Sequence, residues 1–108
     1  MELKTVKYNA EEIKPHSVAR RKFENETSDS NIIYLFYNKT TCLYIGETDT
    51  SLYKRCYEHT PKESEQPWFK EGDTIHIIKL DDSIDRIGRG GLESCFILVH
   101  RPKYNKKC

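Results

Sequence analysis

The side chains best suited to catalysis in this chain of 108 residues include two tyrosines, ten positions apart. Tyr34 and Tyr44 have the same phase in two short aromatic and β-branched runs, 32–37 and 43–47, with polar residues between them. This pattern predicts two strands joined by a turn, and such a hairpin places both phenols on one face. Four more residues that can bind or transfer charge follow in the chain: Arg55, His59, Glu93 and Asn105.

Together these residue types have the chemistry needed to hydrolyse a phosphodiester. A guanidinium stays charged and matches phosphate oxygens in a fork, so Arg55 can hold the phosphate and stabilise the transition state. The carboxylate of Glu93 can bind Mg²⁺, which prefers oxygen ligands and keeps several waters, and Mn²⁺ can take its place. Gly46, at the end of the second run, can let a substrate approach the backbone closely.

The sequence leaves open which group activates the attacking water. A free phenol titrates at about 10, so a tyrosine needs nearby cations to act as a base, whereas His59 titrates near neutrality. One scheme has His59 polarising Tyr34 while Tyr44 orders the water, and the amide of Asn105 orients a tyrosine or the substrate. Each residue also has a structural reading: packed strand tyrosines, an exposed helix arginine, a glutamate favoured by a helix dipole and an asparagine that caps the chain end.

The elements that must position these side chains predict an α+β domain. Beyond the hairpin, residues 51–59 have a helical pattern, residues 74–80 a strand pattern and residues 92–100 a helical pattern. The apolar face expected for the last helix consists of Leu92, Cys95, Phe96 and Val99. The order β-β-α-β-α predicts a small, mostly antiparallel, three-stranded sheet flanked by helices.

We expect the first 30 residues to be a short N-terminal extension and residues 31–108 to form the domain that carries the site. Within the extension, residues 3–8 alternate weakly, which is compatible with an edge strand, and Ser17 is a candidate N-cap for a short helix. The length of the chain suits one small domain.

Composition narrows the classes of protein to consider. Hydrophobic residues make up 36% of the chain and charged residues 32%, so the core must be lean. No stretch approaches the roughly 20 apolar residues that span a bilayer, and the first 14 residues lack an apolar signal core, so we expect a cytoplasmic protein without membrane contact. The net charge of +1 gives no strong overall field to attract nucleic acid. None of the four cysteines forms a C-x-x-C pair typical of zinc sites.

Residues 32–105 resemble the GIY-YIG nuclease domain. Its second motif is intact as Tyr44-Ile45-Gly46, and its first is present as Ile32-Ile33-Tyr34, with isoleucine in place of the glycine. The family's helix arginine, metal-binding glutamate and late asparagine are matched, in order, by Arg55, Glu93 and Asn105. His59 lies one helical turn after Arg55, and this arrangement resembles the pattern of the restriction-endonuclease branch of the family.

The resemblance implies a divalent-metal-dependent DNA endonuclease that uses Mg²⁺, or Mn²⁺ in its place, and an in-line attack of water. Two alternatives remain open. One is an inactive module that keeps the fold and binds nucleic acid or protein, which the missing first glycine and the low net charge favour. The other is a nuclease subunit that needs a partner, because sequence-specific cutting by so small a domain would require a homodimer or a partner subunit. The sequence does not separate DNA from RNA as the substrate.

Overall fold

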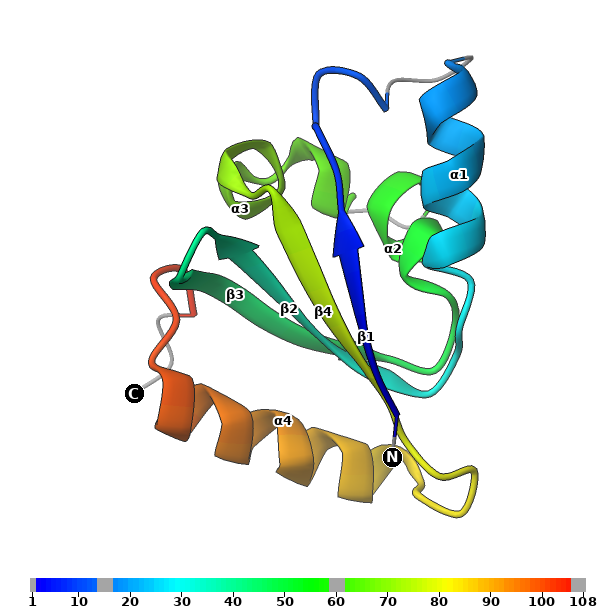
Figure 1. Cartoon of the computed structure of the whole chain (residues 1–108). Coiled ribbons are helices and arrows are strands. Elements are labelled where there is room, and N and C mark those ends of the chain that lie inside the picture. The colour runs from blue at the N-terminus through cyan, green and yellow to red at the C-terminus, as the bar shows by residue number, and fades with distance from the viewer. Residues whose placement is uncertain (1, 14–16, 59–61, 106–108) are drawn as a thin grey trace.

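A four-stranded antiparallel sheet forms the centre of the computed structural model, which describes residues 2–13, 17–58 and 62–105 (Figure 1). The strands are β1 (Glu2–Lys7), β2 (Ile32–Asn38), β3 (Thr41–Thr48) and β4 (Thr74–Lys79). Their spatial order is β1-β4-β2-β3, so β2 and β4 are central and β1 and β3 are the edges. Each paired set of neighbours is antiparallel.

The expectation of a three-stranded sheet is therefore wrong by one strand. β1 pairs with β4 along its whole length, from Glu2 opposite Lys79 to Lys7 opposite Thr74. Its apolar pattern is weak because an edge strand is covered on few sides: Val6 is fully buried, whereas Leu3 is 66% exposed. The possibility of an edge strand at residues 3–8 is confirmed.

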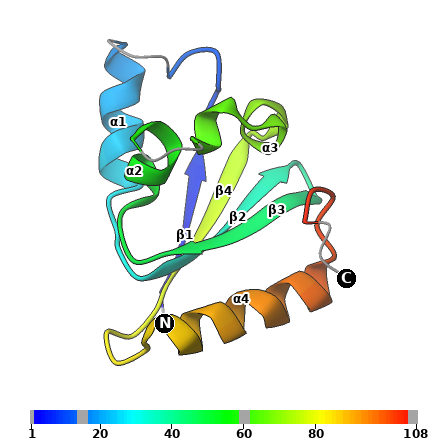
Figure 2. The same cartoon turned by 180° about the vertical axis from the view of Figure 1, so that it is seen from behind.

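Helices cover both faces of the sheet (Figures 1 and 2). One face carries α1 (Val18–Glu26), α2 (Leu52–Tyr57), the short 3₁₀-helix η1 (Glu63–Glu65) and α3 (Pro67–Glu71). The other face carries the long helix α4 (Arg86–His100). Two hydrophobic cores result, and the fold has three layers.

The first 30 residues contribute to the larger of these cores. Val6, Tyr8 and Phe23 are buried in the cluster between the sheet and α1, α2 and α3. Ser17 caps α1 as expected, because its Oγ accepts a hydrogen bond of 3.1 Å from the backbone N–H of Arg20. The domain boundary at residue 30 stays a prediction, although β1 and α1 pack on the same sheet as the rest of the chain.

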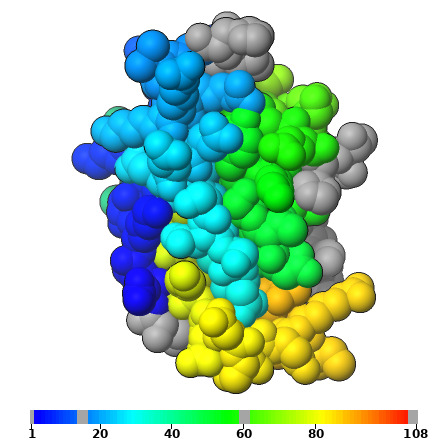
Figure 3. Space-filling view, turned by 90° about the vertical axis from the view of Figure 1, so that its right-hand side faces the viewer, coloured from blue at the N-terminus to red at the C-terminus, as the bar shows by residue number. Residues whose placement is uncertain are grey.

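Helix α1 and the segment after it also support α2. Figure 3 shows this part of the chain, in blue to cyan, lying against the green surface of α2 and the residues that follow. The backbone N–H of Tyr53 donates to the carbonyl of Thr27 at 3.4 Å, and Arg20 donates to the Tyr53 hydroxyl. Because α2 has only six residues, these contacts and its N-cap Ser51 fix the direction in which it presents its side chains.

Helix α4 begins six residues before the expected start at 92. Asp85 is its N-cap and accepts a hydrogen bond of 2.8 Å from the N–H of Gly88. The face packed on the sheet comprises Leu92, Phe96 and Ile97. Cys95 is exposed and Val99 is 77% exposed, so the expected apolar face is only partly right. Within the described ranges, no helix combines the length and apolarity needed to cross a bilayer.

Candidate active site

The β2–β3 hairpin brings the two signature tyrosines together on the face covered by α2 and α3. The ring centroids of Tyr34 and Tyr44 lie 6.4 Å apart, and both rings pack in the larger core. Tyr34 is directly opposite Gly46 in the strand register. A Cβ atom at position 46 would lie 2.4 Å from the Tyr34 ring carbon Cζ and 2.4 Å from its hydroxyl oxygen. Gly46 therefore leaves the space that the Tyr34 ring occupies; its role in substrate approach stays a prediction.

Arg55 extends from α2 toward these tyrosines. Its Nη2 lies 3.8 Å from Oε1 of Glu63, and its side chain is 37% exposed. Its Nε is buried and has no hydrogen-bond partner among the described residues. The positive charge of Arg55 favours the ionised form of both tyrosines, so it opposes the rise in the pKa of Tyr34 and in that of Tyr44. The arginine thus combines proximity to both phenols with donors that protein acceptors do not fully use.

Glu63 is a site residue that the sequence did not reveal. Its side chain is 5% exposed, and its Oε1 accepts a hydrogen bond of 3.0 Å from the Tyr34 hydroxyl. A glutamate in a polar segment is normally exposed, and neither motif nor periodicity singled it out. The burial arises because η1 turns the chain back over α2 and toward the sheet, between α2 and α3.

Trp68 connects Glu63 to the second tyrosine. Its indole Nε1–H donates to Oε2 of Glu63 at 2.7 Å. Its ring stacks on the ring of Tyr44, with the centroids 3.9 Å apart and the planes 7° from parallel. Tyr34, Glu63, Trp68 and Tyr44 therefore form one continuous chain of contacts, so the two signature tyrosines are held relative to each other by α3 as well as by the hairpin.

Burial determines the protonation state of the phenols. It raises the pKa of Tyr34 well above the ordinary value of 10.0, and the negative charge of Glu63 adds to the rise. Burial, with the charges of Glu63 and Glu93, raises the pKa of Tyr44 to about 12. Burial likewise raises the pKa of Glu63, although the hydrogen bonds from Trp68 and Tyr34 oppose this. Both tyrosines are thus neutral phenols at neutral pH.

Glu93 reaches the site from the opposite side of the sheet. It lies in the second turn of α4, is half-buried, and its charge contributes to the raised pKa of Tyr44. In the part of the chain that the structure describes, no three His, Cys, Asp or Glu side chains gather closely enough to enclose a metal. One carboxylate still fits Mg²⁺, because this ion usually takes one or two protein carboxylates and fills its other positions with water and phosphate oxygens.

The position of Glu93 depends on a buried arginine one helical turn earlier. Arg89 donates to the carboxylate of Glu47 on β3, and its Nη1 donates to Oδ1 of Asn31 at 2.9 Å. The Arg89 side chain is 7% exposed, so these interactions are largely shielded from water. They fix α4, which carries Glu93, against the hairpin.

Asn105 is bound to the outer edge of β3. Its Oδ1 accepts a hydrogen bond of 2.7 Å from the N–H of Ile45, and its Nδ2 donates to the carbonyl of the same residue at 2.9 Å. The backbone N–H of Tyr104 donates to the carbonyl of Leu43 at 2.8 Å. Asn105 thereby fixes the residue that follows Tyr44; an additional role in orienting substrate stays a prediction.

The structure gathers three of the predicted residues, Tyr34, Tyr44 and Arg55, around Glu63. The charge of Glu93 raises the pKa of Tyr44, and Asn105 holds Ile45, the next residue after Tyr44. The prediction for His59 lies outside the described residues.

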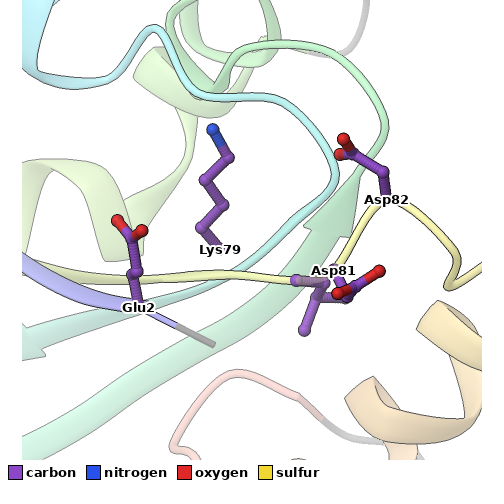
Figure 4. A pocket seen from close by; sticks show the side chains of 5 residues that line it. Glu2, Lys79, Asp81 and Asp82 are labelled. Carbon is purple, nitrogen blue, oxygen red and sulfur yellow. The ribbon is translucent and has the colours of Figure 1, made fainter.

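A separate hollow of about 260 Å³ is lined by Glu2, Lys79, Leu80, Asp81 and Asp82 (Figure 4). Figure 4 shows Asp81 and Asp82 pointing in different directions, so their carboxylates do not converge. Three carboxylates against one ammonium make the lining unfavourable for a phosphodiester. None of the predicted site residues lines this hollow.

Comparisons with known proteins identify the fold and the family. The family model of the GIY-YIG catalytic domain matches residues 30–105. Among solved structures, the chain is similar to the crystal structure of the GIY-YIG N-terminal endonuclease domain of UvrC from Thermotoga maritima, a point mutant bound to its catalytic divalent cation. The TM-score is 0.63 and the identity 23%, over 84% of this chain and 99% of that one. No curated protein sequence matches the chain.

The similarity to the UvrC domain is a similarity of fold, and it confirms the α+β class with an antiparallel sheet and flanking helices. The family model covers well over half of the chain and includes both tyrosine motifs, Arg55, Glu93 and Asn105. The chain therefore belongs to the GIY-YIG family of nucleases.

Proposed function

We propose that this protein is a divalent-metal-dependent DNA endonuclease that hydrolyses phosphodiester bonds by in-line attack of water. The observation that carries the proposal is the convergence of Arg55 with Tyr34 and Tyr44 on one side of β3, with Glu93 of α4 near enough for its charge to raise the pKa of Tyr44. This arrangement offers a cation for the phosphate, hydroxyls for the water and a carboxylate for a metal ion within one region.

Arg55 is the residue that holds the scissile phosphate. The orphaned Nε and the partly exposed guanidinium support this role, because a phosphate oxygen would satisfy donors that the protein leaves unused. Developing negative charge on the phosphate would strengthen the same contacts in the transition state. Tyr34 and Tyr44 orient the attacking water, and His59 is a further candidate for polarising Tyr34.

Glu93 holds the metal ion, which we propose to be Mg²⁺, with Mn²⁺ as a functional substitute. When bound, the ion supplies neutralisation of the phosphate and stabilisation of the leaving 3′ oxygen. The UvrC domain, described as bound to its catalytic divalent cation, supports this proposal at the level of the fold.

The proposed substrate is DNA, and the proposed location is the cytoplasm. The similar domain belongs to UvrC and is described as an endonuclease. The net charge of +1 means that affinity must come from local contacts, not from an overall field. Sequence-specific cutting would need a homodimer or a partner subunit to extend the contact surface.

A cleavage assay tests the proposal directly. Supercoiled plasmid and a branched oligonucleotide would be incubated with the protein in Mg²⁺, in Mn²⁺ or in EDTA. We expect nicking or linearisation with either ion and none in EDTA. Failure to cut both substrates with both ions would refute the nuclease proposal, and cutting of RNA alone would change the substrate.

Two matched pairs of variants locate the site. Glu93→Gln should abolish cutting, whereas Glu24→Gln removes the same charge from an exposed position on α1 and should have no effect. Arg55→Ala should abolish cutting, whereas Lys54→Ala removes the neighbouring, exposed cation of α2 and should retain it. Equal rates within either pair would show that the site is misplaced.

The alternative of an inactive binding module has one observation in its favour. The Glu63 carboxylate lies 3.8 Å from Arg55, where it competes with a phosphate for the guanidinium. This alternative predicts salt-sensitive binding of nucleic acid that EDTA and Glu93→Gln leave unchanged, without cutting.

A further inference from the structure

Glu63 has a position that neither the family motifs nor the proposed chemistry explains. It is the one carboxylate that the structure buries among the described residues. Its partners are all site residues: the Tyr34 hydroxyl at 3.0 Å, the Trp68 indole N–H at 2.7 Å and the Arg55 guanidinium at 3.8 Å. A buried carboxylate is costly to maintain, so its position beside a signature tyrosine requires an explanation.

The hydrogen bond between Tyr34 and Glu63 has a defined direction. An ionised carboxylate only accepts hydrogen bonds, so the Tyr34 hydroxyl donates its proton to Oε1 of Glu63. The lone pairs of the Tyr34 oxygen then point away from Glu63, and the guanidinium of Arg55 also hydrogen-bonds with Tyr34. Tyr34 therefore lies between a proton acceptor, Glu63, and the arginine that we propose to hold the phosphate.

We infer that Glu63 is a positioning residue of the cleavage reaction: it accepts the hydroxyl proton of Tyr34 while that hydroxyl takes a proton from the attacking water. The inference rests on the proposed function. It supplies a proton acceptor for Tyr34 within the described residues.

A transfer in one concerted step avoids a charged phenol. Burial and the negative charge of Glu63 both hold the pKa of Tyr34 far above neutrality, so a waiting phenolate would not be populated. If the hydroxyl gives up one proton as it gains another, the oxygen of Tyr34 stays neutral throughout. The proton then rests on a carboxyl group whose pKa burial has raised, which makes Glu63 a better acceptor than an exposed glutamate.

The bonds balance without a further reagent. An O–H bond of water breaks as its oxygen forms the new bond to phosphorus, and the released proton forms a bond to Oη of Tyr34. The original Tyr34 proton moves to Oε1 of Glu63. The bond from phosphorus to the 3′ oxygen breaks, and its electron pair stays on that oxygen, which takes a proton from solvent. The proton on Glu63 returns through Tyr34 to solvent before the next cycle.

The groups that face Glu63 come from every surrounding element. Arg55 and Cys56 face it from α2, Tyr34 from β2, Tyr44 from β3 and Trp68 from α3. Of these, Arg55 stays a cation, and burial raises the pKa of the Cys56 thiol and of both phenols. Glu63 is thus the one carboxyl group among them, and burial raises its pKa.

The second hydrogen bond to Glu63 shapes the choice of variants. A carboxylate offers two acceptor oxygens, one for Tyr34 and one for Trp68, whereas a glutamine offers one. Glu63→Gln alone would therefore leave the indole facing an NH₂ group. Trp68→Phe removes that donor and keeps an aromatic ring on Tyr44. The double variant Trp68→Phe/Glu63→Gln is therefore compared with the single variant Trp68→Phe. The difference between them reports the ability of residue 63 to accept a proton.

The kinetic test compares these two proteins, with Glu65→Gln as the control for an exposed carboxylate on the same 3₁₀-helix. We expect the double variant to lose about 100-fold in kcat, the lower range for a positioned acid or base, with little change in KM. Its pH–rate profile should lack the acid limb that Trp68→Phe retains. A rate equal to that of Trp68→Phe would overturn the inference, and so would a faster rate, which would mean that Glu63 obstructs phosphate binding at Arg55.

A second readout does not depend on cleavage. Trp68 is the sole tryptophan of the chain and contacts the carboxylate directly, so its fluorescence reports the protonation of Glu63. Wild type should show a fluorescence transition centred at a pH above 4.5, the ordinary glutamate pKa, and Glu63→Gln should not. If wild type shows no such transition, Glu63 does not take up a proton and the inference fails. If wild type titrates but cuts no nucleic acid, the proposed function fails instead.

Discussion

Replacing Gly46 by alanine tests whether the space beside β3 belongs to the Tyr34 ring. The new methyl group would lie 2.4 Å from Cζ and 2.8 Å from Cε1 of Tyr34. Because Tyr34 is only 1% exposed, the ring has no free direction in which to move. Overpacking of this kind costs about 1–3 kcal/mol. For a domain near this size, that corresponds to a drop in Tm of roughly 5–20 °C.

Gly91→Ala is the matched control. A Cβ atom at this position of α4 meets no atom within 4 Å. Alanine is preferred over glycine inside a helix by about 1 kcal/mol, so this variant should be more stable than wild type. The two glycine substitutions are thus expected to change stability in opposite directions, although each adds one methyl group.

Thermal unfolding followed by far-UV circular dichroism measures both effects, without metal or nucleic acid. Gly46→Ala should also reduce cleavage, since a shifted Tyr34 ring loses its hydrogen bond to Glu63. A Gly46→Ala protein as stable as wild type would show that Tyr34 does not lie over Gly46, and the site geometry would need revision.

Three other predictions concern stability. Asn105→Asp should lower the free energy of unfolding by about 1–3 kcal/mol, because the new carboxylate faces the carbonyl of Ile45 where the amide N–H donated; an unchanged midpoint of chemical denaturation would contradict this. Arg89→Met should cost about 1–3 kcal/mol and lower the apparent affinity for metal, since the tie to Glu47 positions α4; an unchanged affinity would contradict this. Burial raises the pKa of Glu63, so the folded state binds its proton more tightly than the unfolded chain. Wild type should therefore lose stability relative to Glu63→Gln as the pH rises from about 4.5, the ordinary value, through the raised one; a gain would reverse the sign of the argument.

The sequence predicted those elements of the fold in which apolar residues recur with a clear period. The alternating aromatic and β-branched residues of β2 and β3 gave the hairpin and the shared face of Tyr34 and Tyr44, and both are found in the structure. β1 was only a possibility, since one buried residue, Val6, gives no period. The start of α4 was placed too late because Gly88, Gly90 and Gly91 disfavour a helix locally, while packing of the helix on the sheet outweighs that cost.

The site was predictable to the extent that it follows family motifs. The family pattern identified Arg55, Glu93 and Asn105 as candidates, but not that the Asn105 amide pairs with the backbone of Ile45. Glu63 was not predictable, because its burial depends on contacts between segments distant in sequence: Tyr34 lies 29 residues away. Nothing in a polar stretch signals that one of its carboxylates turns inward.

The attachment of Asn105 to β3 also bears on how the molecule folds. Its hydrogen bonds to Ile45 close a loop across 60 residues, and the contact between Arg89 and Asn31 spans 58. Closing such loops carries an entropic cost before any contact repays it, and domains dominated by distant contacts fold slowly. The hairpin with its two tyrosines is local and can form early, whereas Glu93 and Asn105 arrive only when these distant contacts close. Nuclease activity should therefore emerge with the slowest folding phase and not with the first appearance of β-structure.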